Sequence, residues 1–176
     1  MKRFNFFWMI LVIFGTTAPR RKFEYEVAPI EPINHMQVLD RDHANDLLLD
    51  VINQGDPALL AEILADYKIN VNDNDHTFIP ILQQAIIAGG DQADQIVKIL
   101  LNAGANIDDQ DMLGMTALML AADSHRKNAG QIAQLLISHG ANFKLKNSAG
   151  QTALEIAQKA DNQAVIAKIQ TAMTAE

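Results

Sequence analysis

The chain has 176 residues, of which 49% are hydrophobic and 20% are charged, and it contains no cysteine. This composition is typical of one ordinary globular domain and excludes a largely disordered or fibrous chain. The lack of cysteine excludes disulfides, cysteine-ligated zinc and catalysis by a thiol.

Charge is distributed unevenly along the sequence. Residues 1–22 contain five basic residues and no acidic residue, whereas the rest of the chain contains nine basic and 21 acidic residues. An acidic folded part repels the phosphate backbone of nucleic acids, which proteins bind through basic stripes. Lys144 with Lys146 and Arg126 with Lys127 are the close basic pairs of this part, and neither pair forms a stripe. We therefore expect no nucleic-acid partner.

Residues 1–18 have the order of a secretory signal peptide. Lys2 and Arg3 give a positive start, residues 4–14 are apolar except for one Asn, and small residues follow. Signal peptides have this order, whereas a transmembrane helix needs about 20 apolar residues. We expect export, to the bacterial periplasm, with secretion or membrane anchoring as alternatives. Pro19 disfavours cleavage before it, so an uncleaved N-terminal anchor stays open.

Residues 19–40 contain three prolines and no helical periodicity. This pattern predicts an extended, proline-containing linker between the signal segment and the folded part. The alternating apolar side chains of residues 23–27 leave a short binding peptide as the alternative.

From about residue 41 onward the sequence repeats itself with a period of 36 residues. Six independent columns align at this shift: Asp75, Asp111 and Asn147; Leu82, Leu118 and Leu154; Ala85, Ala121 and Ala157; Ile63, Ile99 and Leu135; Leu64, Leu100 and Leu136; Asn70, Asn106 and Asn142. Each unit predicts a polar turn, a helix capped by Thr, and a second helix that ends at a glycine. Two helices cannot bury their apolar faces alone, so neighbouring units must stack.

These residues resemble the ankyrin repeat family, whose pattern is D-x-x-G-x-T-P-L-H-x-A-A, then a second helix and L-L-x-x-G-A-N. The closest copy here is DMLGMTALMLAA at residues 111–122, followed by LLISHGAN at residues 135–142. The resemblance covers residues 41–174 and implies an all-α, ankyrin-like solenoid of about four helix-turn-helix repeats with β-turn tips. The expected repeats are approximately residues 41–74, 75–110, 111–146 and 147–174.

The sequence also departs from the family pattern. The family's histidine is replaced by Gln83, Met119 and Glu155, so the hydrogen bonds that it makes between turns must be weaker or rebuilt. Both central repeats carry about three extra residues between their helices. The first and last repeats lack this extension and are typical of caps, which end a stack with a polar outer face.

No pattern in the sequence indicates an active site. Asp123, Ser124 and His125 are neighbours, but three adjacent residues of one loop cannot align as nucleophile, base and orienting acid. The acidic segment at residues 70–75 lacks the glycine and the distal glutamate of a calcium-binding loop. We therefore expect no enzyme, no cofactor and no metal site.

The resemblance implies that binding uses the turn tips and the inner face of the first helices. At these positions the candidate partner-binding residues are His76, Ile79, Met112, Leu113, Met115, Asp123, Ser124, Ser148 and Gln151. Apolar side chains clustered at an exposed tip suggest a protein contact, and Met suits adaptable contacts. The alternative is that Leu113 and Met119 pack between repeats.

The sequence thus predicts an exported, monomeric, non-catalytic interaction module for one protein partner, acting as an inhibitor, immunity factor or adaptor. A secreted effector that binds a host protein, a membrane-anchored scaffold and an enzyme of unknown type are the alternatives. Membrane contact is expected only through the N-terminal segment, if that segment is not cleaved.

Overall fold

The computed structural model describes residues 41–67, 69–72, 79–88 and 90–174. Within these ranges it contains eight α-helices and no strand, which confirms the predicted all-α class. The chain divides into two units, residues 1–35 and 36–176, and the description below concerns the second unit. The predicted signal segment, the predicted linker and His76 lie outside the described residues.

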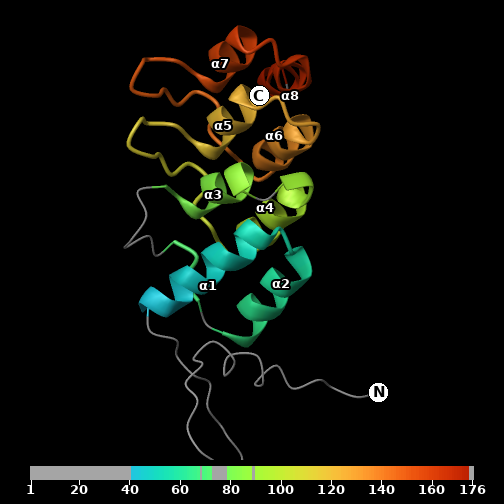
Figure 1. The fold of residues 1–176 in the computed structure, drawn as a ribbon. Coiled ribbons are helices and arrows are strands. Elements are labelled where there is room, and N and C mark those ends of the chain that lie inside the picture. Colours follow the sequence, from blue (N-terminus) through green and yellow to red (C-terminus); the bar gives the residue numbers. More distant parts are fainter. Residues whose placement is uncertain (1–40, 68, 73–78, 89, 175–176) are drawn as a thin grey trace, which may run out of the picture. The chain divides into compact units, whose positions relative to one another are not determined.

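The eight helices form four successive pairs. The pairs are α1 (Arg41–Gln54) with α2 (Pro57–Asp66), α3 (Ile81–Ala88) with α4 (Ala93–Asn102), α5 (Ala117–Asp123) with α6 (Ala129–Ser138), and α7 (Ala153–Lys159) with α8 (Gln163–Met173). The first helices of the pairs contact one another in one layer, and the second helices contact one another in a second layer (Figure 1). This arrangement is the stacked helical solenoid that the sequence predicts.

The core lies between the two layers and follows the 36-residue period. Ala85, Ala121 and Ala157 are fully buried on the first helices, where small side chains let successive helices approach closely. Leu100 and Leu136 are fully buried on the second helices. Each pair therefore buries its apolar face against its neighbours, and the stack stabilises every member.

The helix boundaries follow the predicted signals. Thr116 and Thr152 are N-caps whose hydroxyl groups accept a hydrogen bond from the backbone N–H three residues later, at 3.3 Å and 3.4 Å. Gly104 and Gly140 follow α4 and α6 with φ of +87° and +89°, a conformation that strains any residue with a Cβ. The extra residues of the second repeat include a short 3-10 helix, η3 (Gly90–Gln92), directly before α4.

Candidate functional site

Two turns project from one edge of the helix stack, and we call them finger A (residues 108–115) and finger B (residues 144–151). In finger A the N–H of Gly114 donates to the carbonyl oxygen of Asp111, at 2.9 Å. The Asp111 carboxylate accepts from the N–H groups two and four residues later, each at 2.9 Å. Asn147 makes the corresponding three bonds in finger B, at 2.8–3.0 Å. Both β-turn tips are therefore held by their own hydrogen bonds.

Finger A is also bonded directly to finger B. The N–H of Ser148 donates to the carbonyl oxygen of Leu113, at 2.9 Å. The Gln110 side-chain amide donates to the carbonyl oxygen of Lys146, at 3.0 Å. The fingers approach so closely that a Cβ added at Gly114 would lie 2.9 Å from the backbone nitrogen of Ser148. The relative positions of the two tips are therefore fixed by the backbone.

A buried glutamine holds the base of finger A in place of the family's histidine. The Nε2 of Gln83 donates to the carbonyl oxygens of Met115, at 2.6 Å, and Asp109, at 3.1 Å. Its Oε1 is buried without a hydrogen-bond partner among the described residues. At the equivalent positions Met119 is buried in the core, and Glu155 completes a capping box at the start of α7. The hydrogen bonds at the base of finger A are thus rebuilt by Gln83.

The tip of finger A presents two large apolar side chains to solvent. Met112 is 73% exposed and Leu113 is 67% exposed, so Leu113 does not pack between repeats. Met115 is half-buried, and its sulfur accepts a hydrogen bond from the side-chain amide of Asn147 in finger B, at 3.5 Å. Met112 and Leu113 are therefore available to a partner, whereas Met115 helps to hold the two fingers together.

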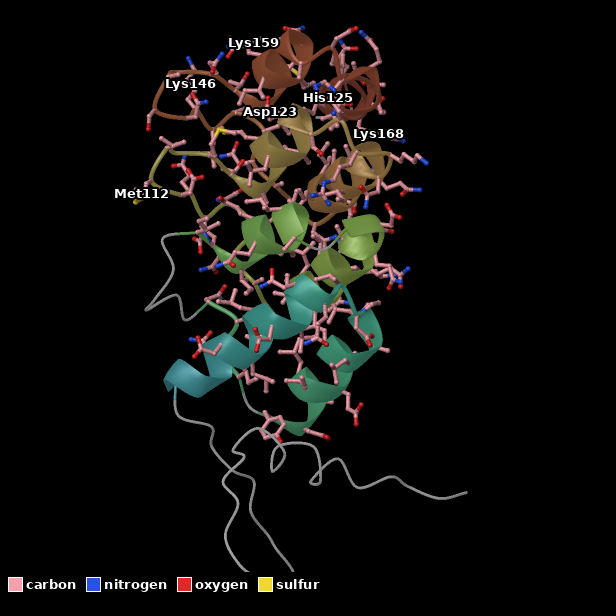
Figure 2. The ribbon with its side chains drawn as sticks, viewed as in Figure 1. Met112, Asp123, His125, Lys146, Lys159 and Lys168 are labelled. Atoms are coloured by element: carbon pink, nitrogen blue, oxygen red, sulfur yellow. The ribbon has the colours of Figure 1, made fainter. Side chains whose placement is uncertain are left out.

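The remaining predicted site residues lie in three places. Ser148 is exposed in finger B beside Leu113, and Gln151 is half-buried at the end of the same finger. Ile79, which is 39% exposed, precedes α3 in an earlier repeat. Asp123 and Ser124 lie at the far end of α5, which at 1.5 Å per residue is about 10 Å from the base of finger A. Figure 2 shows Met112 at a finger tip and Asp123 further in.

The inner face of the first helices, where the resemblance places binding, carries a row of exposed residues. Ile87, Asp123 and Lys159 occupy equivalent positions near the ends of α3, α5 and α7, each 36 residues after the last. Ile87 is 50% exposed, and Asp123 and Lys159 are exposed as well. Lys146 is exposed in finger B. The repeat period aligns this row already in the sequence, whereas no pattern in the sequence singled out Lys146 for binding.

The loops between paired helices are bonded across repeats. Arg126 donates from its guanidinium to the carbonyl oxygen of Ile87, at 2.7 Å. The side-chain amide of Asn162, which caps α8, donates to the carbonyl oxygen of Ser124, at 2.7 Å. The extended loop of the third repeat thus joins neighbouring pairs at the opposite ends of the first helices from the fingers.

The described residues show no arrangement for metal binding or membrane spanning. In this part of the chain no group of three or more His, Asp or Glu side chains could hold a metal ion. No described helix is both long and apolar enough to cross a membrane. The Ser124 hydroxyl oxygen accepts a bond from the backbone N–H of Arg126, at 3.3 Å, which is a local turn contact.

One carboxyl group of the site region has a clearly perturbed pKa. The backbone N–H and the hydroxyl of Thr152 donate to a Glu155 carboxylate oxygen, at 2.7 Å and 3.0 Å. These bonds stabilise the charged form and lower the pKa of Glu155 below its ordinary value of 4.5, with a smaller contribution from Lys146. The charged carboxylate of Glu155 is therefore part of the cap at the start of α7.

Comparison with known families identifies the repeat. A family model described as ankyrin repeats (3 copies) matches residues 82–169. The match spans half of the chain, from α3 to α8, and includes both fingers. No curated protein matches the sequence significantly.

Proposed function

Because this chain belongs to the ankyrin repeat family, we propose that it is an exported inhibitor, immunity factor or adaptor that binds one protein partner through its fingers. Ankyrin repeats indicate a protein–protein interaction module, and proteins of this family are generally non-catalytic. Beyond an interaction module, we propose export, a single partner and a binding surface.

The exposed tip of finger A is the observation that carries the proposed surface. Met112 and Leu113 are adjacent, mostly exposed and apolar, and they stand on a turn that is fixed by its own hydrogen bonds. Full burial of a Met or Leu side chain contributes about 1.5–3 kcal/mol. A rigid turn loses little conformational entropy on binding, so most of this gain is kept.

Export is supported by the order of residues 1–18, with a positive start, an apolar core and small residues. Because the same segment predicts export, we propose that the partner is also in the periplasm. A fusion of residues 1–40 to a reporter enzyme that is active only outside the cytoplasm tests this part. Activity that disappears when the apolar core at residues 4–14 is deleted supports export, and a reporter that is inactive with the intact segment contradicts it.

The binding surface is tested by capture and then by direct measurement. The tagged full-length chain is used to capture proteins from its producing cells, and the captured protein is purified and titrated against variants. The double variant Met112→Glu with Leu113→Glu places two charges at the tip. The control Met173→Glu introduces one such charge at a side chain that is 50% exposed on α8, in the other layer.

We expect the double variant to bind the purified partner at least tenfold more weakly, since the loss of one buried apolar side chain corresponds to about 1.4 kcal/mol or more. The control should bind within about twofold of the wild type, and circular dichroism should show the same helix content for all three proteins. Equal binding by the wild type and the double variant would refute the finger surface.

A further inference from the structure

The sequence of the repeats is electrostatically polarised from its first half to its second. Residues 41–123 contain 14 acidic and three basic residues, whereas residues 124–174 contain two acidic and six basic residues. The finger A tip stands near the boundary between these two parts, because it belongs to the third repeat. Finger A itself contributes Asp108, Asp109 and Asp111 to the acidic part, and finger B contributes the exposed Lys146 to the basic part.

Lys146 supplies one cation of the basic part and is exposed in finger B. Its counterpart in finger A is Gln110, whose amide is used to bond the next finger. Within the described residues no finger follows finger B. The Lys146 side chain therefore has no neighbouring finger to which it could bond as Gln110 does. Lys146 interacts electrostatically with Glu155, and one carboxylate oxygen of Glu155 already accepts hydrogen bonds from Thr152.

Lys159 supplies the second cation. It ends α7 on the exposed row of the first helices, and it forms no ion pair with a described side chain. Figure 2 shows Met112 and Lys146 on neighbouring fingers and Lys159 at α7, whereas Lys168 lies on α8 in the other layer. The fingers and the first helices of the last two repeats thus combine an apolar tip with two available cations.

From this combination we infer that the segment of the partner bound here carries an apolar side chain beside carboxylates. The apolar side chain covers Met112 and Leu113, and the carboxylates face Lys146 and Lys159. The inference rests on the proposed function, and it names the chemistry of the partner and its direction on the surface. Asp123 lies one repeat before Lys159 in the same row and repels carboxylates, so it directs them toward the last repeat.

The probe for this inference is a phage-displayed library of random dodecapeptides, selected on the full-length protein. Peptides that are enriched are then synthesised and titrated by fluorescence anisotropy at low and at physiological ionic strength. The variants are Lys146→Glu with Lys159→Glu, the matched control Lys168→Glu, and Met112→Glu with Leu113→Glu. Lys168 is exposed in the other layer, and its reversal is the same change of charge as each of the two lysine substitutions makes singly.

We expect enriched peptides to combine Leu, Ile, Met or aromatic residues with Asp or Glu. The double lysine variant should bind them about tenfold more weakly at low salt, because exposed pairs are worth a few-fold each and reversal adds repulsion. The difference should shrink as salt rises, and Lys168→Glu should bind within twofold of the wild type.

Three results would overturn the inference. Peptides that need Met112 and Leu113 but are neutral or basic would leave the proposed surface standing and refute the acidic partner. A loss of affinity in Lys168→Glu equal to that in the double lysine variant would show a general charge effect. A selection that enriches no peptide would refute a linear segment as the occupant, while the captured partner still tests the proposed function separately.

Discussion

The close approach of the two fingers predicts different costs for the same substitution at Gly114 and Gly150. Both glycines end a turn with nearly the same positive φ, +70° and +74°, and both donate to the first residue of their turn. A Cβ at Gly114 would lie 2.9 Å from the Ser148 nitrogen and 3.2 Å from two backbone atoms of Asn147. A Cβ at Gly150 would meet nothing within 4 Å. Gly150→Ala is therefore a matched control for Gly114→Ala.

The magnitudes follow from these contacts. The left-handed conformation costs an L-residue about 1–2 kcal/mol, and both variants incur this cost. Gly114→Ala also forces a methyl group against backbone that cannot rotate away, which adds about 1–3 kcal/mol. We expect Gly150→Ala to lower the free energy of unfolding by about 1–2 kcal/mol and Gly114→Ala to lower it by about 2–5 kcal/mol.

Urea denaturation of the full chain, followed by far-ultraviolet circular dichroism, measures both values. The same proteins titrated with the partner should show weaker binding for Gly114→Ala, because the tip carrying Met112 and Leu113 must shift. Equal destabilisation by the two substitutions would refute the close packing of fingers A and B, since only the neighbouring finger distinguishes the two sites.

Three further predictions concern the helices. Gly130→Ala places a methyl group 2.9 Å from the Cβ of Ala164, so it should lower the free energy of unfolding. Adding Ala164→Gly should restore most of this loss, and a double-mutant cycle in urea measures the coupling. Gln83→Met should lower stability by about 1–2 kcal/mol in the same assay, because the carbonyl group of Asp109 loses its side-chain donor and that of Met115 keeps only the N–H of Asp111. Glu155→Gln should reduce stability at neutral pH and leave the difference from the wild type smaller in acid. Because the pKa of Glu155 is lowered in the folded state, the charged carboxylate stabilises the fold at pH values above the ordinary pKa of 4.5. This contribution is lost as the pH falls through the folded-state pKa.

Each of these predictions has a contrary result. Additive effects of Gly130→Ala and Ala164→Gly would show that α6 and α8 tolerate the extra methyl group. A more stable Gln83→Met protein would show that the unpartnered Oε1 costs more than the two bonds contribute. A difference between Glu155→Gln and the wild type that is constant from pH 7 to acid would exclude the capping carboxylate as its cause.

Much of the helical framework was predictable because it is local. The Thr caps, the terminating glycines and the buried alanines each act within one or two turns of a helix, and the 36-residue period repeats them. The replacement of the family's histidine by Gln83 was visible in the sequence, but its partners were not. Gln83 bonds to Asp109 and Met115, which follow it by 26 and 32 residues.

The candidate site was predictable only in part, for a related reason. Met112, Leu113 and Met115 have the same character in the sequence, yet the first two are exposed and Met115 contacts finger B. Exposure at a tip depends on where the next finger lies, and that is decided by packing between repeats. Gln110 and Lys146 are both exposed, yet only Gln110 has a following finger to which its side chain bonds among the described residues.

The sequence by itself therefore determined the repeat, the helix ends, the polar turns and the alanine-rich faces, because each depends on residues close together in the chain. Only the tertiary structure decided which apolar tip residues face solvent, and it showed that Ile87, Asp123 and Lys159, which the period aligns, are all exposed. Those features depend on the stacking of one repeat on the next. Stacking joins residues about 36 positions apart, and the burial of each side chain follows from the neighbour that it meets there.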